Sequence, residues 1–164
     1  GWDVSNVSNM KSMFQSSSFN GDISSWDVSN VTEMQLMFLR TPFNKDISNW
    51  DVSNVINMNN MFESSNFNQP IGDWDVSNVV NMSGMFFQSI GTDANTSDNQ
   101  FNQDISNWDV SNVENMRLMF WGNISFNRDL SSWDVSNVTN CGALNSNSNS
   151  WILPKPNFTN CNPD

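Results

Sequence analysis

The sequence predicts a repeat solenoid, which is a stack of about six similar coils. The hexapeptide WDVSNV occurs six times in the chain, and its first four copies are evenly spaced. The two later gaps between copies are longer. A regular period of about 20 to 50 residues is typical of solenoids and repeat arrays. The tryptophans of the motif are Trp2, Trp26, Trp50, Trp74, Trp108 and Trp133.

Each repeat divides into three predicted elements, which the unit 101–125 illustrates. Apolar and polar residues alternate over Asn107–Val110, and this pattern predicts a short strand. Met116, Met119 and Phe120 follow at helical spacing, so they predict a short helical or 3-10 arc. The Phe-Asn-x-Asp segment that opens each unit is typical of a turn back to the strand. One coil cannot bury its own apolar side, so the coils are expected to stack.

The domain boundaries follow from where the repeat fails. Residues 1–140 are expected to form the solenoid, with an insertion at 89–99. Residues 141–164 are expected to cap its C-terminal end, because a solenoid must shield the apolar face of its last coil. Both cysteines, Cys141 and Cys161, lie in this tail. We predict that they form a disulfide, the alternative being two free buried thiols, and a disulfide implies an oxidising, extracellular setting.

Composition argues against several classes of function. The net charge is −11 and the chain has no histidine. A strongly acidic chain does not suit a nucleic-acid backbone or an anionic membrane surface, and no segment resembles a transmembrane span. The sequence contains no Ser/His/Asp arrangement, phosphate loop or zinc spacing, so we expect no enzymatic activity and no cofactor.

An aspartate follows the tryptophan of every repeat and is expected to point outward on the strand. Two interpretations of this column remain open. The carboxylates bind calcium, which prefers oxygen ligands, or they accept local hydrogen bonds from serine and backbone N–H groups. The absence of an EF-hand or a glycine-rich calcium repeat favours local bonding. The calcium candidates are Asp27, Asp51, Asp75, Asp109 and Asp134.

Asparagine recurs twice per unit, and we expect both columns to satisfy backbone groups at the turns. Several asparagines also begin Asn-x-Ser/Thr sequons. Those in the first column cannot carry glycans if that column is buried. The glycosylation candidates are therefore Asn95 in the insertion, Asn123 in an irregular turn after Gly122, and Asn157 in the tail.

The first coil starts directly at Trp2, which leaves its apolar end open. One explanation is that the chain is cut from a longer array. The other is that Trp2 lies on an assembly surface, where copies of the chain stack end to end.

The spacing Ile-x-x-Trp-x-Val-x-x-Val-x-x-Met resembles the leucine-rich repeat, and most closely its BspA-like branch. The sequence pattern WDVSNVTNM…MF…FNxDIS is similar to the surface-protein repeat of mycoplasma lipoproteins, and the resemblance covers residues 1–140. It implies a right-handed coil stack in an extracellular or cell-surface protein, often an adhesin.

The leading functional hypothesis is therefore an adhesion module for a protein or glycan on a cell surface. Its expected contacts are Ser132, Asp134, Ser136 and the 89–99 loop. One alternative is a structural subunit of a surface filament or coat, made of copies joined through the first coil. The other alternative is calcium-dependent carbohydrate binding by the aspartate column.

Overall fold

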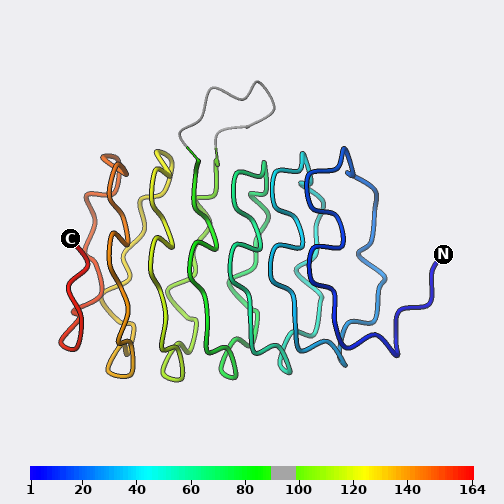
Figure 1. Ribbon diagram of the computed structural model, residues 1–164, viewed down its shortest axis with the longest axis horizontal. Helices are drawn as coiled ribbons and strands as arrows, with labels where there is room; N and C mark the ends of the chain where they lie inside the picture. Colours follow the sequence, from blue (N-terminus) through cyan, green and yellow to red (C-terminus); the bar gives the residue numbers. More distant parts are fainter. Residues whose placement is uncertain (90–98) are drawn as a thin grey trace.

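The chain winds into successive coils that lie side by side along the long axis of the molecule (Figure 1). This computed structural model describes residues 1–89 and 99–164. The two termini lie at opposite ends of the stack. Most of the expected 89–99 insertion, including Asn95, falls outside the described residues. Within the described ranges the coils contain no regular helix or strand, and isolated parallel bridges join neighbouring coils. The bridges are Asn9–Glu33, Glu33–Asn57, Asn57–Asn81, Asn81–Asn115 and Asn115–Asn140.

The predicted strand at Asn107–Val110 is wrong, because the chain bends at this point. The carboxylate of Asp109 accepts a hydrogen bond from the Ser111 N–H at 3.0 Å. The Val113 N–H then donates to the Val110 carbonyl at 2.9 Å and closes a turn. The parallel pairing therefore occurs further along the coil, at Asn115.

The predicted helical or 3-10 arc is also wrong, and the reason lies in how the backbone N–H groups are shared. In the second coil, the N–H groups of Met34 and Leu36 donate to the next coil, at Asn57 and Asn59. The Phe38 N–H also donates to the next coil, at Met61, whereas the Met37 N–H between Leu36 and Phe38 donates back to the Met34 carbonyl within its own coil. Because alternate N–H groups are committed to a neighbouring coil, a continuous helical ladder cannot form. The segment becomes a chain of consecutive turns instead.

We call this segment the turn ladder, and in successive coils it comprises residues 8–17, 32–41, 56–65, 80–89, 114–123 and 139–148. Its turns require a left-handed backbone at regular positions, mostly without glycine. Leu36 has a φ of 62° and Leu118 one of 59°. A left-handed conformation costs an ordinary residue about 1–2 kcal/mol, which the bonds between coils must offset. The left-handed residues are Ser12, Ser16, Leu36, Arg40, Asn60, Ser64, Gly84, Leu118, Gly122, Ala143 and Asn147.

The core runs the length of the stack as columns of repeated apolar side chains. The Phe62 ring is fully buried, and its centroid lies 5.6 Å from Phe38, 4.0 Å from Phe67 and 5.9 Å from Phe86. The tryptophans bind between coils as well, since the indole N–H of Trp74 donates to the Ile47 carbonyl at 3.2 Å. Each coil therefore buries its apolar side only against its neighbours.

The predicted disulfide between Cys141 and Cys161 is present, with 5.8 Å between the two Cα atoms. The tail nevertheless follows the repeat for longer than its sequence indicates. The Phe120 N–H donates to the Leu144 carbonyl in the same way as in earlier coils. Trp151 then packs edge-on against Phe120 and Phe126, at 5.1 and 5.0 Å. Residues 141–164 thus form a further irregular coil that also covers the last ring column.

Candidate functional site

The aspartates that follow tryptophan are hydrogen-bonded within their own coil. Asp75 accepts the backbone N–H of Ser77 at 3.0 Å and its hydroxyl at 2.6 Å. A second column, represented by Asp104 and Ser106, repeats the backbone bond at 3.0 Å. Asp134 likewise binds Ser136, so two of the expected partner contacts are turned toward each other. These carboxylates shape the turns and remain exposed to solvent.

Hydrogen bonding also sets the acidity of this column. The Ser77 hydroxyl, and then its N–H, lowers the pKa of Asp75 below the ordinary value of 3.8, while the neighbouring Asp109 charge opposes that shift. Across residues 1–89 and 99–164, no three His, Cys, Asp or Glu side chains are grouped to hold a metal ion. Each calcium candidate accepts a bond from a serine instead, and these residues are Asp27, Asp51, Asp75, Asp109 and Asp134.

Both asparagine columns bind backbone groups of a neighbouring coil. In the first column, the amide of Asn78 donates to the Ser53 carbonyl at 2.8 Å. In the second, the side-chain oxygen of Asn68 accepts the Asn102 N–H at 3.0 Å. The first column is exposed at the surface, but its amide groups are used by the fold.

Of the glycosylation candidates, Asn157 is exposed. The prediction that Asn123 lies in an exposed turn is wrong, because its side chain is 0% exposed. Its amide donates to the Phe101 carbonyl at 3.2 Å, and its oxygen accepts the Phe126 N–H at 3.1 Å. Asn99, which is also buried, receives a further bond from this amide. Sequence analysis missed this buried polar network at the corner of the coil.

The turn ladder carries the side chains that differ most between coils, and they include two aromatic residues outside the core. Phe87 and Trp121 are half-buried and stack on each other, with ring centroids 4.8 Å apart and planes at 15°. Sequence analysis also missed this pair. The sequence does show, in these two coils, an aromatic residue directly after the repeated phenylalanine, and this could have identified the pair. The second and third coils have Leu39 and Glu63 at that position.

Trp2 is the residue at which end-to-end assembly is expected. Its side chain is 70% exposed, and its ring stacks on Trp26 at 6.2 Å. The spacing is close to the 6.4 Å between Trp108 and Trp133 inside the stack.

Among the residues that the structure describes, no helix has the length and apolar character needed to cross a membrane. No curated protein and no solved structure matches the chain. One family model matches it twice, over residues 1–99 and 93–159, and together the two matches contain all six repeats. The chain therefore belongs to the family described as "Mycoplasma protein of unknown function, DUF285".

Proposed function

We propose that this protein is an extracellular or cell-surface interaction module, an adhesin built as a BspA-like, leucine-rich-repeat-type solenoid. The observation that carries the proposal is a division of the surface. The repeated Asp, Ser and Asn side chains are occupied by bonds within the stack, whereas the turn ladder presents different side chains from coil to coil. A surface that distinguishes partners needs such differences, and a solenoid offers them over an extended area.

One column of the turn ladder shows this variation clearly. The position after the bridged residue and the buried methionine is Lys11 in the first coil, Gln35 in the second and Asn59 in the third. It is Ser83 in the fourth coil and Arg117 in the fifth. Lys11 and Arg117 are exposed. By contrast, the sequence WDVSNV is identical in all six repeats. We infer that a protein or glycan on a cell surface binds along the turn ladder.

The setting inferred from the disulfide supports a location outside the cell. Disulfides persist in oxidising compartments and are rare in reducing ones. Cys141 is fully buried and bonded to Cys161, so the last coil depends on this bond. Binding, rather than catalysis, is the activity that we propose for such a module.

The test is adhesion of the chain, coupled to beads, to cultured epithelial cells and to immobilised extracellular-matrix proteins. Arg117→Glu reverses an exposed charge on the turn ladder, and Lys45→Glu reverses one on the Phe-Asn segment as a matched control. We expect Arg117→Glu to reduce adhesion and Lys45→Glu to leave it unchanged. Equal effects of the two variants, or no adhesion by the original chain to any surface, would contradict the proposal.

End-to-end assembly is the second candidate function, and the exposure of Trp2 is the observation that favours it. A coil stacked on Trp2, from a longer chain or from another copy, would bury its ring. Sedimentation equilibrium should then show polymers that grow with concentration and disappear in Trp2→Asp. Ile56→Asp is the control, because Ile56 is 46% exposed on the flank of the stack. A monomer at all concentrations would exclude assembly of this chain.

A further inference from the structure

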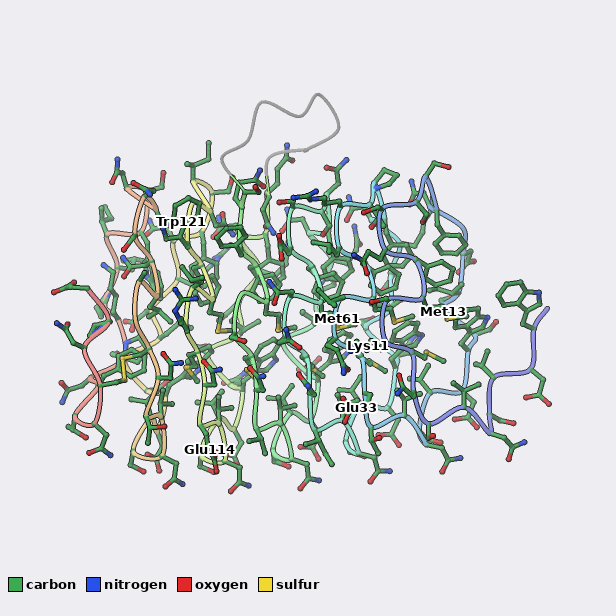
Figure 2. All side chains as sticks on the ribbon, viewed as in Figure 1. Lys11, Met13, Glu33, Met61, Glu114 and Trp121 are labelled. Atoms are coloured by element: carbon green, nitrogen blue, oxygen red, sulfur yellow. A yellow bond between two sulfur atoms is a disulfide. The ribbon has the colours of Figure 1, made fainter. Side chains whose placement is uncertain are left out.

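The stacked pair of Phe87 and Trp121 lies outside the apolar core. Phe86 and Phe120, the residues directly before them, are 0% exposed and belong to the core. Each of these two coils therefore directs one aromatic ring inward and the next one outward. Figure 2 shows Trp121 near the upper edge of the stack and Glu114, at the start of the same turn ladder, near the lower edge. The outward pair is thus a surface feature at one edge of the molecule.

The Trp121 side chain is half-buried, and Phe87 stacks on one face of its indole. Among the described residues no ring stacks on the other face, which we call the open face. The next coil places Ser146 in register with Trp121, because the Asn115–Asn140 bridge and the bond from the Gly122 N–H to the Ser146 carbonyl set that register. Serine is too small to cover an indole ring. The aromatic column therefore ends at Trp121, although the coils continue beyond it.

The indole N–H of Trp121 also differs from those of the repeated tryptophans. The four buried indoles at Trp50, Trp74, Trp108 and Trp133 each donate to a backbone carbonyl of a neighbouring coil. In the part of the chain that the structure describes, the Trp121 indole N–H has no acceptor within hydrogen-bond distance. Within the described residues, this side chain therefore makes none of the hydrogen bonds that join the coils.

The residues that flank Ser146 in the sequence are uncharged and polar. Residues 145–150 read Asn-Ser-Asn-Ser-Asn-Ser, and the Asn147 side chain is exposed at a left-handed position with a φ of 61°. Amide and hydroxyl groups both donate and accept hydrogen bonds. On the far side of Phe87, the equivalent residue of the preceding coil is Glu63. With a net charge of −11, this surface disfavours an anionic ligand.

We propose that the open face of Trp121, together with Ser146 and Asn147, binds one ring of a neutral oligosaccharide. A pyranose has an apolar C–H face, which gains from burial against the electron-rich face of an indole. Its hydroxyl rim pairs with amide and hydroxyl side chains. An aliphatic peptide side chain would cover the indole but leave those polar groups unpaired, which costs binding free energy. This inference rests on the proposed interaction function and specifies its ligand.

The experiment is calorimetric titration of the full chain with three neutral probes, cellotetraose, tetra-N-acetylchitotetraose and lacto-N-tetraose, and with anionic sialyllactose. We expect at least one neutral probe to bind with a Kd of about 1 mM or lower. Trp121→Ala should weaken that binding about tenfold or more, by analogy with bases stacked on aromatic side chains. Trp2→Ala, which removes another exposed indole, should leave it unchanged. Sialyllactose should bind more weakly than the neutral probe.

A second variant keeps Trp121 and covers it. Ser146→Leu would cover the open indole face with an aliphatic side chain that offers no ring, so it should abolish sugar binding without lowering the thermal unfolding midpoint. The inference is overturned if no neutral probe binds up to about 10 mM, or if either Trp121→Ala or Ser146→Leu binds sugar like the original chain. Adhesion to cells without binding of any probe would leave the interaction module standing and reject only this site. Binding of a probe without adhesion to any surface would support this site and contradict the proposed adhesion.

Discussion

Replacing Phe62 by alanine tests whether a continuous column of rings holds the coils together. Its ring is fully buried, and its centroid lies between 4.0 and 6.5 Å from those of Phe38, Phe67, Trp74 and Phe86. Truncating a core phenylalanine costs about 3–5 kcal/mol, through lost burial and the cavity left behind. Hydrogen bonds to the next coil at Phe62 and Ser64 restrict collapse of the cavity. We therefore expect the upper part of this range, about 4–5 kcal/mol.

Guanidinium unfolding followed by circular dichroism measures this loss. Because each coil contacts only its neighbours, a weak interface in the middle of the stack should also broaden the transition or split it in two. Phe87→Ala is the matched control, since it removes the same side chain from an outward position, and it should cost about 1 kcal/mol. Equal costs for the two variants, or a loss below about 2 kcal/mol for Phe62→Ala, would refute the role of the ring column.

Four further predictions follow from individual bonds and backbone angles. Nine aspartates have pKa values below the ordinary 3.8 because a serine donates a hydrogen bond to each carboxylate. The stability that these bonds contribute to the fold is therefore present above about pH 4 and is lost as the pH falls through the lowered pKa values. Unfolding midpoints measured across an acid series will show this loss. Cys161→Ser should cost about 3 kcal/mol for a bridge with a sequence separation of 20, and the difference from the original chain should vanish when both are unfolded in reductant. Asn123→Leu leaves the Phe101 carbonyl and the Phe126 N–H without their buried partner, so urea unfolding should show a loss of about 2–4 kcal/mol. Arg40→Gly should raise the unfolding free energy by about 0.5–1 kcal/mol because Arg40 is exposed with a φ of 53°, and Arg40→Val should lower it.

The repeat itself predicted which side chains face the core. A residue type that recurs at one spacing occupies one environment inside the stack, so Val76 and Met82 are buried like their equivalents, and Trp74 is buried like Trp50, Trp108 and Trp133. Cys141 occupies the position of a repeated methionine and is likewise buried. The local conformation was less predictable. The alternation of apolar and polar residues around Trp108 indicated a strand. The local conformation is instead set by a hydrogen bond between the backbone and a side chain. Asp109 binds the Ser111 N–H and bends the chain.

Asn123 was mispredicted because the left-handed positions of the turn ladder have no sequence signature. These positions hold serine, leucine, arginine and asparagine as well as glycine, so Gly122 was mistaken for an irregular turn. Gly122 is in fact the equivalent of Arg40 and Ser64, and Asn123 is the buried corner residue that follows. Trp121 was missed because it lies outside the position at which tryptophan repeats. No other coil has a tryptophan at this position of the turn ladder.

The bonds between coils have a consequence for how such proteins change over time. The Met58 N–H reaches Asn81 in the next unit of ordinary length, whereas the Met82 N–H reaches Asn115 across the insertion, and both bonds measure 2.9 Å. The inserted residues thus enter one coil without altering the register of the next. A gene that encodes this chain tolerates both duplication of whole units and insertions at the corner after Gln88. Selection is then free to alter chain length and surface loops separately, while each unit keeps the same few residues that lock it to its neighbours.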